Sequence, residues 1–75
     1  MDGLKPIKPE KLIKIIGSLG FLILRQSGSH VIMKHPDGRT TVVPFHKGEL
    51  IDRGLLRKII RDELKISRDE FLELV

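Results

Sequence analysis

In residues 20–44, GFLILRQSGSHVIMKHPDGRTTVVP, short apolar runs alternate with turn residues. The apolar runs are too short for surface helices and rich in large or β-branched side chains, so each predicts a strand. We place the three strands at residues 21–26, 30–34 and 39–43. Ser27-Gly28-Ser29 separates the first two, and His35-Pro36-Asp37-Gly38 is a strong turn signal before the third. Strands joined by such short turns predict an antiparallel meander.

Amphipathic segments flank this stretch on both sides. Residues 9–19 carry apolar side chains at helical spacing, with Pro9 suited to a first helical turn. A second amphipathic segment follows Asp52, a good helix cap, and Ser67 and Glu70 have the spacing of a capping box before a last short helix. The side chains expected to point inward are Leu12, Ile13, Ile15, Ile16, Leu19, Leu55, Leu56, Ile59, Ile60, Leu64, Phe71, Leu72 and Val75. The order predicts an α+β sandwich, α-β-β-β-α plus a short C-terminal helix, with both long helices on one face of a three-stranded antiparallel sheet.

Length and composition limit the classes of protein that fit. Seventy-five residues make one small domain, which we place at residues 9–75, preceded by a flexible tail at residues 1–8 whose start we expect to be disordered. The chain has no cysteine, which argues against a secreted disulfide scaffold and a thiolate metal site. The longest apolar run, residues 21–24, is too short for a membrane span or a signal peptide. We therefore expect a soluble, cytoplasmic protein without a membrane partner.

The charge is modest in total but unevenly distributed. Fourteen basic and ten acidic residues give a net charge of +4. Residues 1–48 hold eight basic and three acidic residues, a net charge of +5, whereas residues 49–75 hold six and seven, a net charge of −1. An anionic partner such as a nucleic acid therefore fits the first two-thirds of the chain, although uneven surface charge on an ordinary domain gives the same pattern.

Gly28-Ser29-His30 is the constellation best suited to chemistry. Glycine before a strand lets a phosphate approach the backbone, the serine can donate to an anionic oxygen, and histidine exchanges protons near neutral pH. Strand alternation places Val31 and Met33 in the core and His30, Ile32 and Lys34 on the face without helices, provided that the register is correct. The alternative is a hairpin turn followed by an ordinary exposed histidine.

The other two histidines divide between structure and function. His35 lies in the His-Pro-Asp-Gly turn and is best interpreted as a surface turn residue, whereas His46 follows the third strand and could approach the same face as His30. Three histidines without helical ligand spacing do not form a metal site, so we expect no metal and no small-molecule cofactor. No Walker A loop, dinucleotide-binding glycine motif or nucleophile elbow is present in the sequence.

The ordered combination of segments resembles the HicA family of bacterial toxins over about residues 9–75. The segments that carry this resemblance are Leu19-Gly20-Phe21, Gly28-Ser29-His30, the turn at residues 35–39, Val42-Val43-Pro44-Phe45-His46 and Gly54-Leu55-Leu56-Arg57-Lys58-Ile59-Ile60. The resemblance implies a fold like the double-stranded-RNA-binding domain. It also implies a type II toxin that cleaves mRNA and is inhibited by a HicB antitoxin, with the catalytic histidine of the Gly-Ser-His motif at His30.

These expectations combine into one mechanism. His30 would act as general base or acid when the ribose 2′-OH attacks the adjacent phosphate, and the product would be a 2′,3′-cyclic phosphate. Gly28 and Ser29 would orient the phosphate, Lys34 would offset negative charge, and His46, His35, a lysine or water would be the second proton carrier.

Two other classes stay open. The rival is a non-catalytic double-stranded-RNA-binding module, although Asp52-Arg53-Gly54-Leu55 offers only one basic residue where such modules carry lysines. The third reading is a chain that acts chiefly through a protein partner, in which an inhibitor covers the face that carries His30.

Overall fold

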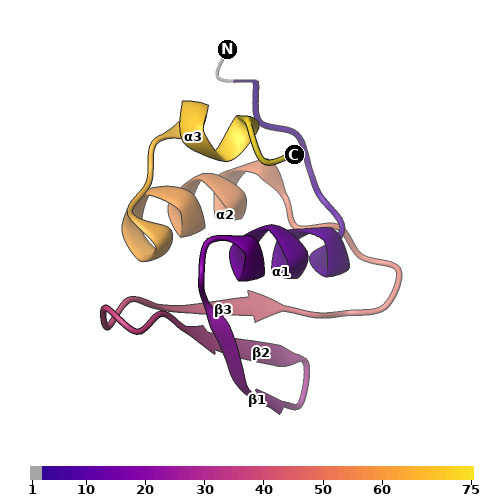
Figure 1. Cartoon of the computed structure of the whole chain (residues 1–75). Coiled ribbons are helices and arrows are strands. Elements are labelled where there is room, and N and C mark those ends of the chain that lie inside the picture. Colours follow the sequence, from indigo (N-terminus) through magenta and orange to yellow (C-terminus); the bar gives the residue numbers. More distant parts are fainter. Residues whose placement is uncertain (1–2) are drawn as a thin grey trace.

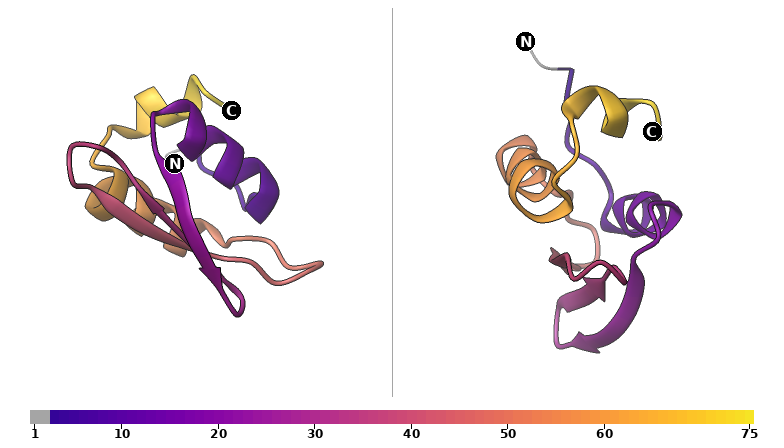
Figure 2. Two further views of the ribbon diagram at one scale, coloured as in Figure 1. Left: turned by 60° about the horizontal axis from the view of Figure 1, so that its bottom comes forward. Right: turned by 60° about the vertical axis from the view of Figure 1, so that its left-hand side comes forward.

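The computed structural model describes residues 3–75 and has the predicted α+β layout. Helix α1 (Pro9–Ser18) is followed by strands β1 (Leu22–Ser27), β2 (His30–Lys34) and β3 (Thr40–Pro44), then by α2 (Arg53–Lys58), the π-helical turn η1 (Ile59–Leu64) and α3 (Arg68–Leu72). The sheet is antiparallel throughout, in the order β1-β2-β3. The helices lie on one side of it and leave the other side uncovered (Figures 1 and 2).

The alternation of β2 separates the two faces of the sheet as predicted. Val31 and Met33 are buried among the core side chains, whereas His30 and Lys34 are exposed and Ile32 is half-buried. Because directly opposite residues in an antiparallel pair project to the same face, the registers assign the neighbouring strands as well. We call the uncovered side the outer face; its side chains are Leu22, Arg25, Ser27, His30, Ile32, Lys34, Thr40, Val42 and Pro44.

The two edges of the sheet differ. Along β3, Glu63 of η1 accepts hydrogen bonds from the Val42 N–H (3.3 Å) and from the buried Thr41 hydroxyl (2.5 Å), so the helical layer holds this edge through its side chain. Along β1 all six residues are exposed, including the large apolar side chains of Leu22 and Leu24. The sheet is therefore held through β3, and the β1–β2 hairpin extends beyond the helical layer (Figure 2).

The helices begin and end largely where their capping residues predict. Asp52 accepts a hydrogen bond from the Leu55 N–H (2.8 Å) and Ser67 accepts one from the Glu70 N–H (3.0 Å). The segment after Asp52 changes from α2 to the wider η1 turn, which ends where Lys65 adopts φ of +56°. In the last helix Phe71 is buried as expected, but Val75 is 57% exposed, because α3 ends at Leu72 and the chain turns outward.

The N-terminal segment is more closely bound to the domain than a flexible tail would be. Ile7 exchanges backbone hydrogen bonds with Ile51 (3.1 and 2.8 Å), and the side chains of Leu4 and Ile7 belong to the core. Two apolar residues three positions apart are too few to give a periodic signal, so the sequence pattern missed this packing. The disorder expected at Met1 and Asp2 lies outside the described residues.

Candidate functional site

The β1–β2 hairpin positions the Gly28-Ser29-His30 motif. Ser27 pairs with His30, which leaves Gly28 and Ser29 as the two central residues of the turn. Gly28 has φ of +58°, and a glycine in this conformation at the first central position is typical of a type II′ hairpin. A Cβ added at Gly28 would meet nothing within 4 Å, so the turn conformation accounts for glycine here, and the backbone is open to solvent.

His30 is the first residue of β2 and stands exposed on the outer face. Its strand neighbours there are Ser27 on one side and Pro44 on the other. Within residues 3–75 its imidazole makes no recorded hydrogen bond or ion pair. The side chain is therefore accessible to a molecule bound on this open face.

His46 lies at the same end of the sheet as His30. The Ser29 carbonyl accepts a hydrogen bond from the Phe45 N–H (2.6 Å), which links the β1–β2 hairpin to the loop that follows β3. His46 comes directly after Phe45, is exposed, and begins a turn closed by the Glu49 N–H bonding to the His46 carbonyl (3.0 Å). The structure thus brings Gly28, Ser29, His30 and the His46 loop together at one end of the sheet.

Lys34 shares the outer face with His30 but lies at the other end of β2. Four residues along a strand correspond to about 13 Å. A lysine at that distance suits a more distant phosphate of an extended anionic ligand better than the phosphate next to His30. The structure therefore separates Lys34 from the other four predicted site residues.

Two residues outside the predicted site, Ser27 and Arg25, stand closer to His30 than Lys34 does. Ser27 is directly opposite His30, and Arg25 is directly opposite Ile32, the next outer-face residue along β2. The signal that could have identified them is the two-residue turn, because it fixes which residues of β1 and β2 face each other. Regular alternation from Leu22 and Ile23 would place Arg25 on the core side of β1. The register shifts between Ile23 and Arg25, and this shift places Arg25 on the outer face.

The third histidine, His35, has a structural role at the opposite end of β2. Its ring packs edge-on against Phe21 (5.2 Å between ring centroids), and its side chain is 21% exposed, so it is not the surface turn residue that the sequence suggests. Its Nδ1 accepts a hydrogen bond from the Asp37 N–H (3.0 Å) and lies 3.0 Å from Asp37 Oδ1. His35 therefore anchors the β2–β3 turn to the core.

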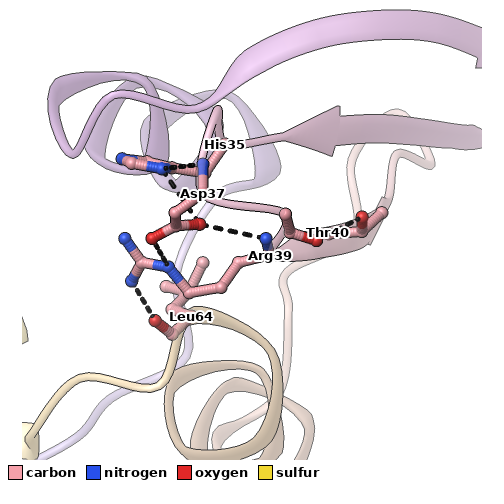
Figure 3. Close-up of polar contacts among 6 residues, drawn as sticks. His35, Asp37, Arg39, Thr40 and Leu64 are labelled. Atoms are coloured by element: carbon pink, nitrogen blue, oxygen red, sulfur yellow. Dashed lines mark hydrogen bonds and ion pairs between the residues drawn. The ribbon is translucent and has the colours of Figure 1, made fainter.

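Asp37 and Arg39 complete this anchor (Figure 3). The Arg39 N–H donates to Asp37 Oδ1 (3.0 Å), and this bond, together with the Arg39 guanidinium, holds the pKa of Asp37 below its usual value. Arg39 Nε donates to Asp37 Oδ2 (2.8 Å) and Nη1 donates to the Leu64 carbonyl (2.5 Å), so the turn is tied to the end of η1. The guanidinium also stacks over Phe21 at 5.2 Å.

Two negative findings hold for residues 3–75. No group of three histidine, cysteine, aspartate or glutamate side chains is arranged to hold a metal ion. No helix in this described part is both long and apolar enough to span a membrane.

Comparison with known families agrees with this description. A family model described as "HicA toxin of bacterial toxin-antitoxin" matches residues 9–63, which include α1, the whole sheet, α2 and most of η1. No individual curated protein matches the chain at a significant level. Because the matched segment covers more than half of the chain, this protein belongs to the HicA family, whose members are toxins of bacterial toxin-antitoxin systems.

Proposed function

We propose that this toxin is an endoribonuclease that cleaves mRNA in the cytoplasm, that residues 9–75 form the toxin domain, and that His30 is the general acid or base. The observation that carries the proposal is the position of His30, exposed on an uncovered sheet face directly after a tight turn. A single-stranded RNA can lie across such a face without entering a cavity, and the net charge of +4 favours its approach.

The RNA supplies the nucleophile in this mechanism. The ribose 2′-oxygen forms a bond to the adjacent phosphorus while the bond from phosphorus to the 5′-oxygen breaks. His30 takes the proton from the 2′-OH, and a second group returns a proton to the departing 5′-oxygen. The products are a 2′,3′-cyclic phosphate and a 5′-hydroxyl, and no step requires a metal ion or a cofactor.

The turn and the loop after β3 supply the other parts of the site. The exposed Gly28 backbone and the Ser29 hydroxyl can orient the phosphate, and Lys34 can bind the RNA farther along β2. His46 is the leading candidate for the second proton carrier, because the Ser29–Phe45 hydrogen bond holds its loop beside the hairpin.

His30→Ala tests the proposal. Because a positioned histidine typically contributes 10²–10⁴-fold, we expect cleavage of an mRNA transcript to slow by about that factor and growth arrest on expression in bacteria to disappear. Gln26→Ala, at an exposed position of the same hairpin, should keep both activities. A folded His30→Ala protein that cleaves RNA at the wild-type rate would refute the assignment, and duplex-RNA binding without cleavage by the wild type would favour a non-catalytic binding module.

The pH dependence of the cleavage rate tests the role of His46. With two histidines in the reaction, the wild-type rate should follow a bell-shaped profile, and His46→Ala should retain only the limb that belongs to His30. A single limb in the wild-type profile would exclude a two-histidine mechanism and leave water or a lysine as the second carrier.

The family implies a cognate antitoxin, and we propose a HicB-like protein that covers the outer face. An inhibitor bound there would stop RNA from reaching His30 and would need acidic groups opposite Arg25 and Lys34. Co-purification with a small acidic protein encoded next to this gene, lost when RNA is in excess, is the expected result. Simultaneous binding of that protein and RNA would contradict a shared surface.

A further inference from the structure

Arg25 is the arginine of the outer face, and its side chain does not take part in the core. Arg25 is exposed, and within residues 3–75 its guanidinium has no recorded hydrogen bond or ion pair. By contrast, Arg39 is bound to Asp37 and Leu64, Arg61 to Asp62 and Arg68 to Asp69. Arg53 also makes no hydrogen bond or ion pair within residues 3–75, but it begins α2 in the helical layer and is not on the outer face. An arginine without a protein partner on an open face is available to bind an anion.

The backbone of β1 is irregular where Arg25 reaches this face. Phe21 and Arg25 are four residues apart, so they would project to the same face of an uninterrupted strand. Instead Phe21 is 2% exposed in the core, whereas Arg25 is opposite Ile32 on the outer face. The register shift between Ile23 and Arg25, with Leu24 as the additional residue, allows both placements.

The register also fixes the distance of Arg25 from His30. Arg25 is directly opposite Ile32, so its diagonal neighbours on the outer face are His30 and Lys34. Diagonal positions of an antiparallel pair are roughly 7–8 Å apart, which a long arginine side chain spans easily. Lys34 lies about 13 Å from His30 along the same strand. Arg25 is therefore the outer-face cation nearest to His30.

We propose that Arg25 binds the RNA phosphate on which His30 acts, with the Ser27 hydroxyl as a neutral donor beside it. The planar guanidinium can donate two parallel hydrogen bonds to the non-bridging oxygens, which a lysine cannot do. As the 2′-oxygen adds to phosphorus, negative charge grows on those oxygens, and the guanidinium stabilises it. The inference rests on the proposed RNA cleavage and assigns a substrate contact to a residue outside the Gly-Ser-His motif.

The kinetic test compares Arg25→Gln, Arg25→Lys and Lys34→Gln on one mRNA transcript. Arg25→Gln should lower kcat about 10²–10³-fold, which is the loss expected for one donor aimed at a developing oxyanion. Arg25→Lys should recover only part of this loss, and Lys34→Gln should stay within about tenfold of the wild type because its phosphate is not the reacting one. Equal rates for Arg25→Gln and Lys34→Gln would overturn the proposal.

A binding test separates this inference from the proposed function. A fluorescent 2′-O-methyl RNA of mixed sequence has no 2′-hydroxyl nucleophile and cannot be cleaved by the proposed route, so its affinity reports phosphate contacts alone. Arg25→Gln should weaken its binding about tenfold or more, while Gln26→Ala should leave it unchanged. If the wild type cleaves no RNA, the proposed function fails. The affinities of wild type and Arg25→Gln for the 2′-O-methyl RNA then test separately whether Arg25 binds phosphate. Equal affinities for wild type and Arg25→Gln would refute the phosphate site.

Thermal unfolding and circular dichroism provide the structural control. Because Arg25 is exposed and its side chain makes no hydrogen bond or ion pair in the described part of the chain, both Arg25 variants should unfold within a few degrees of the wild type. A much lower Tm for Arg25→Gln than for Gln26→Ala would show that Arg25 stabilises the hairpin, and the loss of binding would then count against the proposal.

Discussion

Gly20, between α1 and β1, is a position where both backbone conformation and space require glycine. It has φ of +101°, and a Cβ at this position would lie 2.9 Å from Nε2 of His35. Gly20→Ala should therefore lower the free energy of unfolding by about 1–3 kcal/mol, through backbone strain and displacement of the His35 ring. Gly17→Ala is the matched control: nothing lies within 4 Å of its added Cβ, and alanine in a helix should stabilise by about 0.5–1 kcal/mol. Urea denaturation measures both changes, and a destabilising Gly17→Ala would contradict this account.

Asp37 makes the stability of the β2–β3 turn depend on pH in the acidic range. Its pKa is lowered from 3.8, first by the hydrogen bond from the Arg39 N–H. A carboxyl whose pKa is lower in the folded state stabilises the protein above its unfolded pKa, and this contribution disappears as pH falls through the folded value. The Tm difference between wild type and Asp37→Asn should thus be largest above about pH 5 and shrink below pH 4. A difference that is constant from pH 7 to pH 2 would show that ionisation of Asp37 does not contribute.

For single residues, the sequence predicts the placements that follow from local alternation and misses those that depend on strand pairing. His30 could be predicted to face away from the core because β2 alternates regularly between Val31 and Met33. The outer-face position of Arg25 could not be predicted in this way. Alternation from the buried Phe21 assigns Arg25 to the core side, and the register shift in β1 reverses that assignment. The half-buried position of His35 depends on close packing with Phe21 and Gly20 from another part of the chain, which no local pattern contains.

Among the elements, η1 connects the helical layer to the edge of β3. Glu63 accepts hydrogen bonds from the Thr41 hydroxyl and the Val42 N–H, and Thr41 is 1% exposed. Glu63→Ala leaves that buried hydroxyl without its recorded partner and should cost about 1–3 kcal/mol of unfolding free energy.

A double-mutant cycle isolates this contact. Thr41→Val removes the hydroxyl while keeping the side-chain shape, so combining it with Glu63→Ala should cost less than the sum of the two single changes. Urea denaturation of the four proteins gives the coupling free energy. Additivity within about 0.5 kcal/mol would contradict a direct contact.

The order of helices and strands could be predicted because turn residues, capping residues and apolar patterns all indicate the same elements. The strand turns, the Asp52 and Ser67 caps and the amphipathic faces all indicate the order that the structure has. The change from α2 to η1 matches none of the sequence patterns considered above, and residues 59–64 contact both β3 and α3. The packing of residues 3–8 was also hidden, since it depends on a bridge to Ile51, more than 40 residues away in the sequence.

Across the whole molecule, the uneven charge separates α1 and the sheet from the later helices. The sheet lies entirely within residues 1–48, which carry a net charge of +5, whereas α2, η1 and α3 lie in the part with a net charge of −1. Arg61 and Arg68 in this second part are bound to Asp62 and Asp69, which reduces their ability to hold an external anion. The outer face carries Arg25 and Lys34, whereas Lys8, Lys11 and Lys14 lie at or in α1, so charge alone does not decide between the outer face and the helices as the surface that binds RNA.

Salt dependence distinguishes these two surfaces. For a single strand, the logarithm of the binding constant falls with the logarithm of salt concentration by about 0.7 for each phosphate neutralised. We expect a slope near −1.4 if Arg25 and Lys34 each neutralise one phosphate, with contacts beyond these two making it steeper. Measured on cleavage-deficient His30→Ala protein, Arg25→Gln and Lys34→Gln should each reduce the slope by about 0.7, while Arg61→Gln should leave it unchanged. An Arg61→Gln effect equal to that of Arg25→Gln would place the RNA on the helical layer, where it could not reach His30 on the opposite face of the sheet.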